Sequence, residues 1–251
     1  MINQTVIVTG GSSGMGKHMA KKFAKEGANV SITGRHEARL KEALQEMDGN
    51  VLPIVMDVRQ IDDVHRMVEE TVKNFGTIDY LVNNAAGNFI VNAEDLSING
   101  WNAVIDIVLN GTFYCSQAVG KYWIKEKIKG TILNIVATYA WDAGVGVVHN
   151  AAAKAGVLSL TRTLAVEWGR KYGIRANAIA PGPIERTGGM EKLMLSEEMS
   201  EQTRQSVPLK RFGKPEEIAG LAYFLLSKDA AYINGEVVAM DGGQWLNPMP
   251  F

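Results

Sequence analysis

The sequence predicts a doubly wound α/β fold, in which helices cover both faces of one parallel sheet. Short runs of β-branched residues alternate with longer amphipathic segments along the whole chain, which is typical of consecutive βαβ units. A glycine-rich turn follows the first of these runs, at the place where such folds bind ligands. The 251 residues, 46% of them hydrophobic, suffice for one continuous core, so we expect a single domain over residues 1–251.

Each predicted strand is followed by a segment whose apolar residues recur with helical spacing. The first strand leads into a helix that Gly27 ends, and the last helix has Pro215 near its start. The predicted strands are 5–9, 29–33, 51–56, 79–83, 131–136, 175–180 and 236–240. The predicted helices are 14–26, 36–47, 61–75, 101–125, 150–172 and 215–227, and the polar, methionine-bearing segment at about 187–206 is expected to form a helical flap after strand six.

Composition excludes several classes of partner. The formal net charge is -1, so no overall field attracts nucleic acid or an anionic membrane. Cys115 is the single cysteine, which excludes a disulfide framework and a thiolate metal cluster, and we expect no metal site. The chain enters a strand pattern directly, without a secretory leader, and no apolar run reaches membrane-spanning length. These features predict a soluble cytoplasmic protein.

The turn TGGSSGMG at 9–16 predicts a nucleotide site. Gly10 and Gly14 permit a tight turn and close approach of a ligand, and Gly16 permits close packing of helix on sheet. The helix start offers free N–H groups and a positive dipole to a pyrophosphate. A glycine-rich turn alone is a weak signal, but its position after the first strand favours nucleotide binding over an ordinary turn. The expected contacts are Gly10, Ser12, Ser13, Gly14, Met15 and Gly16.

The end of the second strand indicates which dinucleotide binds. Thr33, Gly34 and Arg35 stand where an acidic residue would bind a ribose 2′-hydroxyl, and no carboxylate occurs before Glu37. The planar guanidinium of Arg35 suits a 2′-phosphate, which favours NADP(H). The alternative is that Arg35 is a solvated residue at a helix start.

Further cofactor contacts are expected at the carboxyl ends of the next strands, where ligands bind in parallel sheets. The small side chains at 85–87 would allow a flat ring to approach the backbone, whereas Asn84 could instead bond only to neighbouring backbone. The predicted contacts are Asp57, Val58, Asn84, Ala85, Ala86 and Gly87.

Together these motifs resemble the short-chain dehydrogenase/reductase family. TGGSSGMG, NNAAG at 83–87, Asn110, Lys154 followed by AGV, and PGPI at 181–184 occur in the family's order over essentially the whole chain. The resemblance implies a Rossmann fold and hydride transfer from a nicotinamide cofactor beside a Ser, Tyr, Lys and Asn group. It adds Lys154, Pro181, Gly182 and Ile184 to the expected cofactor contacts.

The sequence departs from this family at the reactive group. Most members carry Tyr four residues before the Lys, on the same helix face, and a Ser at the preceding strand end. Here Asn150 occupies the first position, and the strand end reads Ala137, Thr138. Tyr139, just beyond that strand, is the candidate replacement. From residue chemistry alone, packing of its ring on Trp141 is an equally good interpretation.

A closer resemblance favours the catalytic interpretation. AAGNF at 85–89, DIVLNGT at 106–112, the Tyr139 to Lys154 spacing and PGPI resemble the 2,4-dienoyl-CoA reductases. That resemblance implies that Tyr139 and Asn110 donate hydrogen bonds to the thioester oxygen of an acyl-CoA, and that Lys154 binds the nicotinamide ribose. The cationic Lys154 would also lower the pKa of Tyr139.

Two other functions stay open. One is reduction of a ketone or 3-oxoacyl thioester, which predicts the absent Ser and helix Tyr; the other is nucleotide binding without catalysis, which predicts loss of Asn110 or Lys154. His149 could act as an acid or base near neutral pH, but a role at the helix start or in substrate contact is favoured. The flap could hold CoA phosphates through basic residues or simply present them to solvent: Arg186, Lys192, Arg204, Lys210, Arg211 and Lys214.

Three expectations concern larger-scale features. The flap's apolar residues could form a lid over an acyl chain or pack as an ordinary helix: Met190, Leu193, Met194, Leu195 and Met199. The apolar faces of the two long helices predict a homotetramer, as the family often forms. The aromatic tail at 245–251 could close the site of a neighbouring subunit.

Overall fold

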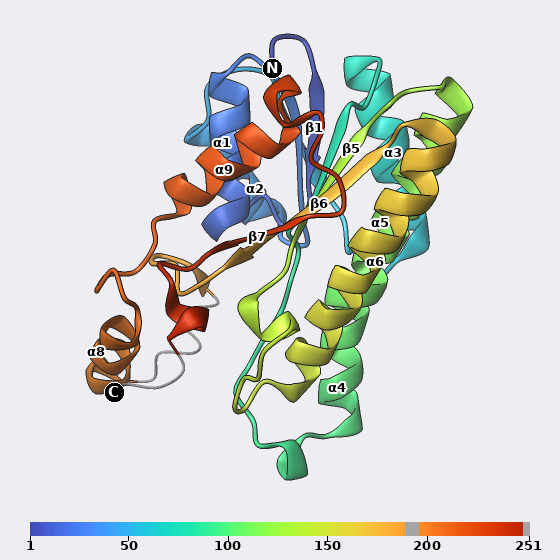
Figure 1. The fold of residues 1–251 in the computed structure, drawn as a ribbon. Coiled ribbons are helices and arrows are strands. Elements are labelled where there is room, and N and C mark those ends of the chain that lie inside the picture. Colours follow the sequence, from blue (N-terminus) through green and yellow to red (C-terminus); the bar gives the residue numbers. More distant parts are fainter. Residues whose placement is uncertain (189–195, 248–251) are drawn as a thin grey trace.

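The computed structural model describes residues 1–188 and 196–247 and contains a seven-stranded sheet (Figure 1). The strand order is β3-β2-β1-β4-β5-β6-β7, and every neighbouring pair is parallel. The strands are β1 Thr5–Val8, β2 Asn29–Gly34, β3 Val51–Val55, β4 Tyr80–Asn83, β5 Thr131–Ile135, β6 Arg175–Pro181 and β7 Val237–Met240. The chain reverses direction across the sheet between β1 and β4, which creates a crevice at their carboxyl ends.

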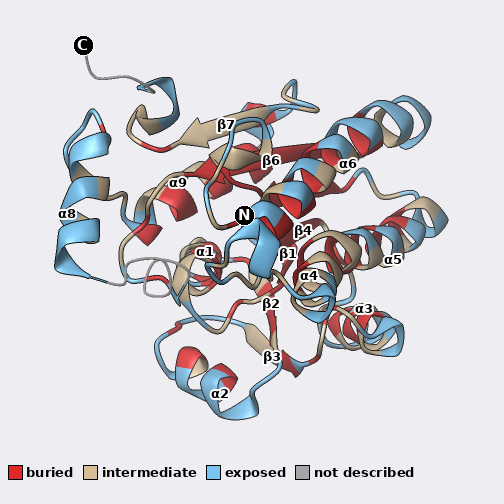
Figure 2. Ribbon diagram, turned by 90° about the horizontal axis from the view of Figure 1, so that it is seen from below, coloured by how far each residue is buried: buried red, intermediate tan, exposed pale blue. Residues whose placement is uncertain are grey.

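Helices cover both faces of this sheet, as predicted (Figures 1 and 2). One layer contains α1 Gly14–Lys25, α2 Glu37–Gln45 and α9 Pro215–Leu226, and the other contains α3 Ile61–Phe75, α5 Gly111–Glu126 and α6 Val148–Tyr172. Buried residues lie along the sheet and on the helix faces turned toward it, whereas exposed residues lie on the outer faces (Figure 2). The doubly wound fold is thereby confirmed.

The alternation of side chains along β1 shows how the two cores form. Val6 and Val8 are fully buried in the cluster beneath α1 and α9, and Ile7 is fully buried in the cluster beneath α3 and α5. Successive side chains of a strand point to opposite faces, so a continuous apolar run suits a sheet covered on both sides. On the second side, Trp123 is completely buried and its indole Nε1 donates to the carbonyl oxygen of Ile78 at 2.7 Å.

The predicted helix at 101–125 is wrong in one detail. It is divided into α4 Ile98–Ile105, a π-helical turn Asp106–Asn110, and α5. A π turn contains one more residue than an α turn, and such turns occur often at functional sites. The following Gly111 approaches Val58, in the turn after β3, so closely that a Cβ would lie 2.7 Å from Val58 Cγ2. Side-chain periodicity does not reveal this insertion.

The last quarter of the chain is less regular. The second half of the predicted flap forms α8 Glu197–Ser206, which the Ser196 hydroxyl caps by accepting a hydrogen bond from the Met199 amide. The predicted lid residues Met190, Leu193, Met194 and Leu195, and Lys192, lie outside the described residues. Short 3-10 turns occur at Ala93–Asp95, Thr138–Ala140, Lys228–Ala230 and Gln244–Leu246. Among the described helices, none is both long and apolar enough to cross a membrane.

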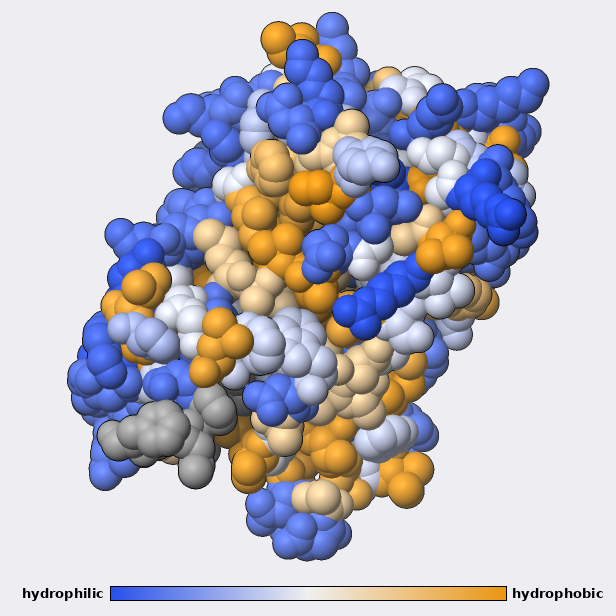
Figure 3. Space-filling model, viewed as in Figure 1, coloured by the Kyte–Doolittle hydropathy of each residue, from blue (hydrophilic) through white to orange (hydrophobic). Residues whose placement is uncertain are grey.

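The surface is polar at its periphery and apolar along the middle of one face (Figure 3). The edge strand β7 has the sequence VVAM, and all four of its residues are only partly buried. An edge strand of this composition is suited to contact with another apolar surface.

Two glycines test the packing of the helical layers. A Cβ at Gly120, on α5, would lie 2.4 Å from the Trp168 ring on α6, whereas one at Gly220, inside the exposed part of α9, would meet no atom within 4 Å. Gly120→Ala should therefore lower the free energy of unfolding by roughly 1–3 kcal/mol. Gly220→Ala should raise it by roughly 0.5–1 kcal/mol, because alanine favours a helix interior. Urea denaturation measures both, and equal effects would contradict this packing.

Candidate active site

The carboxyl ends of the strands surround a cleft of about 730 Å³. Most of the predicted site residues meet there, although they are far apart in the sequence. Those lining the cleft are Gly10, Ser12, Ser13, Gly14, Met15, Arg35, Asp57, Val58, Asn84, Ala85, Ala86, Gly87, Tyr139, Lys154, Pro181, Gly182 and Ile184. Gly16 and Asn110 do not line it.

The glycine-rich turn has the geometry of a phosphate-binding loop. Gly10 and Gly14 have φ of 65° and 51°, in the left-handed region that favours glycine. A Cβ at Gly16 would lie 2.4 Å from both the Gly10 oxygen and Asn84 Nδ2, so this glycine serves packing. No side chain caps the start of α1, so its first N–H groups remain suited to an anionic group.

Asn84 connects two of the loops that line the cleft. Its Nδ2 donates to the carbonyl oxygens of Thr9 and Gly10 at 3.0 and 3.2 Å. The Thr9 hydroxyl in turn accepts from the backbone amides of Asn84 and Ala85 at 3.0 and 3.1 Å. The alternative that Asn84 bonds to neighbouring backbone is therefore realised, and its side chain holds the β1 and β4 loops together.

The end of the cleft near β2 contains three basic side chains. Arg35, His36 and Arg39 line it, and Arg39 stands one helical turn beyond Arg35. Sequence reasoning did not select Arg39, although its spacing from Arg35 was visible. Nearby, Asp57 accepts hydrogen bonds from the Arg59 guanidinium at 2.6–3.0 Å, which lower the pKa of its carboxyl group. This set of groups fits a dinucleotide with an additional phosphate at its adenosine end.

Tyr139, Asn150 and Lys154 meet at the other end of the cleft. Tyr139 lies in the 3-10 turn that follows β5, and its hydroxyl oxygen accepts a hydrogen bond from Asn150 Nδ2 at 3.2 Å. Lys154, one turn later on α6, donates from Nζ to the carbonyl oxygen of Ile135 at 2.6 Å. The predicted relocation thus places a phenol beside the position that the usual tyrosine would occupy. Trp141, the alternative neighbour of Tyr139, packs edge-on against Trp245 instead, with ring centroids 5.7 Å apart.

The predicted effect of Lys154 on Tyr139 is not found. Burial raises the pKa of Tyr139 to about 12, and burial lowers the pKa of Lys154 to about 8. The Lys154 ammonium is directed to a backbone carbonyl rather than to the phenol. At neutral pH, Tyr139 is therefore protonated and able to donate a hydrogen bond.

Two asparagines differ in whether their side-chain N–H groups are free to donate a hydrogen bond to a group bound in the cleft. Asn110 Nδ2 donates to Asp106 Oδ1 at 2.8 Å within the π turn. Asn88, which sequence reasoning missed, lines the cleft, and its Oδ1 accepts from the Phe89 amide at 2.9 Å. Among described residues, Asn88 Nδ2 makes no hydrogen bond, so both of its N–H groups remain available. The AAGNF motif contained Asn88, but only its small residues were selected.

His149 lies beneath the segment that carries Asn88. Its side chain is fully buried, and its ring centroid is 4.5 Å from that of Phe89. Burial lowers the pKa of His149, and neither ring nitrogen has a hydrogen-bond partner among the described residues. The His149 ring therefore packs against Phe89 as a neutral group, at the predicted helix start.

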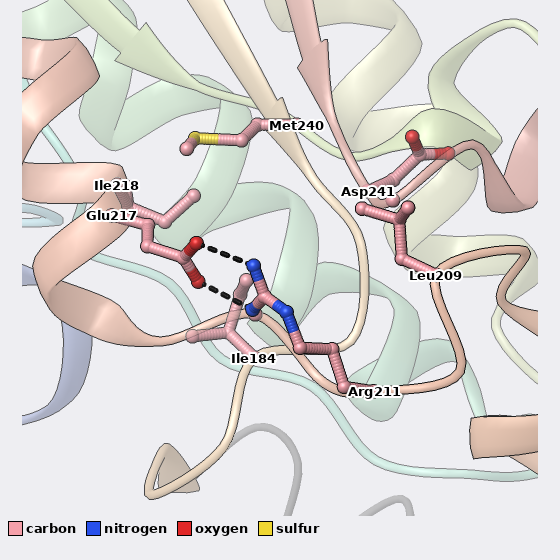
Figure 4. A pocket seen from close by; sticks show the side chains of 9 residues that line it. Ile184, Leu209, Arg211, Glu217, Ile218, Met240 and Asp241 are labelled. Carbon is pink, nitrogen blue, oxygen red and sulfur yellow. Dashed lines mark hydrogen bonds and ion pairs between the residues drawn. The ribbon is translucent and has the colours of Figure 1, made fainter.

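The basic residues expected to meet CoA phosphates are mostly paired within the chain. Arg186 binds Glu216 at 2.8 Å, and Arg204 binds Glu201. Arg211 forms two hydrogen bonds to Glu217, at 2.7 and 2.8 Å, in a small hollow of about 110 Å³ (Figure 4). Glu217 also accepts from the Lys214 amide at the start of α9, and these bonds lower its pKa to about 2. In Figure 4, the Arg211 and Glu217 side chains face each other, as expected for a structural ion pair.

The chain is similar to known proteins over almost its whole length. A family model described as Enoyl-(Acyl carrier protein) reductase matches residues 10–244. The chain is 64% identical over 254 residues to a probable, (2E)-enoyl-CoA-producing 2,4-dienoyl-CoA reductase of Bacillus subtilis (strain 168), with 100% of both chains covered. It is 42% identical to a peroxisomal, (3E)-enoyl-CoA-producing 2,4-dienoyl-CoA reductase of Arabidopsis thaliana, over 97% of this chain and 85% of that one.

Solved structures show the same fold. A short chain dehydrogenase from Bacillus anthracis is 64% identical with a TM-score of 0.92, over 99% of both chains. An actinorhodin polyketide ketoreductase with NADPH is 28% identical with a TM-score of 0.91, over 96% of this chain and 97% of that one. With the family's glycine-rich turn, lysine and cleft in place, the chain belongs to the short-chain dehydrogenase/reductase family of oxidoreductases.

Proposed function

We propose that the protein reduces 2,4-dienoyl-CoA to an enoyl-CoA with NADPH, in the breakdown of unsaturated fatty acids. The observation that carries this proposal is the position of Tyr139, whose hydroxyl contacts Asn150 in the cleft where ordinary family members have their helix tyrosine. The relatives named 2,4-dienoyl-CoA reductases, one of them identical at 64% of positions, support this choice of substrate.

When bound, a nicotinamide cofactor would supply the hydride that the distal carbon of the conjugated diene accepts. Negative charge then moves through the π-system to the thioester oxygen, where fixed donors stabilise the dienolate. Tyr139 suits this role because burial keeps it protonated. It donates a hydrogen bond and keeps its proton, and the carbon next to the thioester takes a proton from solvent. The remaining double bond then lies between the former second and third carbons of the diene, as in the (3E) product named for the Arabidopsis thaliana relative. The Bacillus subtilis relative is named for a (2E) product, which would instead require the proton at the third carbon of the diene.

The second donor is an asparagine amide. The family resemblance favours Asn110, whereas the contacts favour Asn88, which lines the cleft and has both N–H groups available. We therefore propose Tyr139 and Asn88 as the direct donors. Asn110 would then act within the π turn through its bond to Asp106.

The cofactor would occupy the cleft from α1 to Lys154. The α1 start and Ser12 to Gly14 would hold the pyrophosphate, and Arg35 with Arg39 the 2′-phosphate. Lys154 would donate to the nicotinamide ribose. Its ammonium is anchored by Ile135 and keeps further N–H donors.

We also propose that the protein assembles as a homotetramer. Apolar side chains of the long helices, such as Phe113 (41% exposed) and Val166 (71% exposed), and the edge strand β7 would be covered in a homotetramer. Trp245 contacts Trp141 of its own chain, so this part of the tail packs against the loop after β5 of the same subunit. We place the protein in the cytoplasm, acting on acyl-CoA thioesters.

Initial rates of NADPH oxidation with 2,4-decadienoyl-CoA and with acetoacetyl-CoA test the function. We expect rapid oxidation with the dienoyl thioester and little with the 3-oxoacyl thioester, because the site lacks the helix tyrosine. Faster oxidation with acetoacetyl-CoA would support a ketone reductase instead. No oxidation with either would support a non-catalytic nucleotide-binding protein.

Tyr139→Phe removes the hydroxyl while keeping the ring. Loss of one preorganised donor should reduce kcat by roughly 100-fold to 1,000-fold, with NADPH affinity unchanged. The control is Tyr232→Phe, because Tyr232 is fully exposed. Steady-state kinetics and NADPH fluorescence titration measure these quantities, and a kcat equal to that of the control would exclude Tyr139 as a donor.

Asn88→Ala and Asn110→Ala separate the two candidate amides. If Asn88 binds the thioester oxygen, its alanine variant should lose roughly 100-fold in kcat at unchanged thermal stability. Asn110→Ala removes a bond inside the π turn, so it should lower stability together with activity. Melting temperatures and kcat are compared for both. A kcat loss confined to Asn110→Ala, at wild-type stability, would restore Asn110 as the donor.

Arg35→Ala tests the cofactor preference. The change removes a planar cation that suits a 2′-phosphate, so kcat/KM for NADPH should fall by roughly 10-fold to 100-fold, the value of one to two charge-assisted hydrogen bonds. The value for NADH should change little, because NADH lacks that phosphate. Equal losses with both cofactors would indicate that Arg35 does not bind the 2′-phosphate.

A further inference from the structure

His149, at the start of α6, is a buried polar side chain without a polar partner. Its ring is fully buried, and in the part of the chain that the structure describes neither Nδ1 nor Nε2 makes a hydrogen bond. A neutral imidazole has one N–H donor and one acceptor nitrogen, and burial leaves both unsatisfied. An apolar side chain of similar size would fill this place without that cost. The imidazole differs from such a packing residue in its ability to gain a proton near neutral pH.

Phe89 separates the His149 ring from solvent. The two ring centroids are 4.5 Å apart, and the outer part of the Phe89 side chain leaves it 38% exposed. A Cβ at Gly100 would lie 3.0 Å from Phe89 Cζ, so the phenyl ring is held between α4 and the start of α6. Two residues later, the Val91 amide donates to the carbonyl oxygen of Gly146 at 3.0 Å. The position of the phenyl ring therefore depends on the imidazole beneath it.

The same phenylalanine is joined to the proposed donor Asn88. The Phe89 amide donates to Asn88 Oδ1 at 2.9 Å, and the Asn88 side chain lines the cleft. Because this bond occupies the amide oxygen, Nδ2 is the half of the amide that remains for a substrate. A displacement of Phe89 would move its backbone amide and release the bond that fixes Asn88. His149 can thus act on the reaction through Phe89, and this step rests on the proposed role of Asn88.

Nothing within residues 1–188 and 196–247 stabilises a proton on the His149 ring. Burial is the sole cause of its lowered pKa, and α4 contains no charged residue. The titratable groups on the other segments near the start of α6 are exposed or bonded elsewhere: Glu94, Asp95, Asp106, Tyr139, Asp142 and Lys154. The packed form binds a proton less readily than a histidine in water does. The packing is therefore unaffected above a pH of about 6.5 and weakens as the pH falls from there through the lowered pKa.

We propose that His149 is a positioning residue that holds Asn88 in place through Phe89 only while its imidazole is neutral. At neutral pH the ring supports Phe89, and the Asn88 amide keeps its N–H groups available to the cleft. A proton gives the imidazole a charge and a second N–H donor in an apolar place, so the ring must move toward water past Phe89. Turnover is consequently lost in mild acid through a side chain that touches neither substrate nor cofactor.

His149→Ala and His149→Leu separate packing from protonation. At neutral pH, His149→Ala should reduce kcat with 2,4-decadienoyl-CoA by roughly 10-fold to 100-fold, because Asn88 loses its fixed position, while the dissociation constant of NADPH stays unchanged. His149→Leu restores the packing and should recover most of this loss. In acid, kcat of the wild type should fall by about tenfold per pH unit below the midpoint of His149 protonation, and this acid limb should be absent from His149→Leu. His65→Leu, at an exposed position of α3, is the matched control and should keep the limb.

Hydrogen exchange measures the opening without substrate. After correction for the intrinsic rate, the Val91 amide should exchange up to about tenfold faster at about pH 5.5 than at neutral pH, because that is one unit below the ordinary pKa of histidine. In His149→Leu this change should be absent. Wild-type kcat in His149→Ala, no acid-dependent exchange in the wild type, or an acid limb that persists in His149→Leu would each overturn the proposal. Failure of wild-type turnover with 2,4-dienoyl-CoA would instead contradict the proposed function, since hydrogen exchange needs no substrate.

Discussion

A buried ammonium group fixes the geometry on which the site depends. Lys154 is 6% exposed, and its Nζ donates to the carbonyl oxygen of Ile135, the last residue of β5, at 2.6 Å. An ammonium removed from water requires such a partner, so α6 has little freedom to rotate or slide against the sheet. With α6 held in this way, Asn150 lies one turn earlier beside the 3-10 turn that carries Tyr139.

This constraint explains how a phenol from the loop can lie near the position of the usual helix tyrosine without a change of fold. The loop after β5 and the start of α6 are both held by the Lys154 bond, so a phenol from the loop reaches the region that a helix phenol would occupy. Tyr139 is mostly shielded from water, and this burial raises the pKa of its hydroxyl to about 12. A neutral hydrogen-bond donor is suited to stabilising a dienolate that is later protonated from solvent.

Periodicity and turn chemistry predicted most of the fold. The alternating strand and helix patterns depend on local spacing, and residues such as Gly10 and Gly27 mark turns that only glycine adopts readily. The π turn at Asp106–Asn110 could not be predicted, because one additional residue in a turn leaves the apolar spacing of a buried helix almost unchanged. The ion pairs of Arg186 and Arg211 could not be predicted either. Each joins a residue that flanks the flap to a glutamate at the start of α9, and this contact exists only in the folded chain.

The sequence predicted which loops form the site. It did not predict the directions of all the side chains on those loops. Tyr139 could be selected because an expected tyrosine was absent at Asn150, but the bond between them required the folded helix. Asn88 was missed because its small neighbours accounted for the motif. Only the folded structure shows that Asn88 lines the cleft, whereas the Asn110 amide bonds to Asp106. The direction of a side chain decided each of these cases, and sequence spacing does not report it.

The central claim is conjugate reduction with stabilisation of a dienolate, and the fate of isotopes tests it most directly. The reaction is run with NADPH deuterated at the transferred position, and the product is analysed by NMR. The account predicts deuterium at the distal diene carbon, with a solvent-derived hydrogen at the carbon next to the thioester. Deuterium at a carbon bearing a hydroxyl group, formed by reduction of a carbonyl, would contradict it.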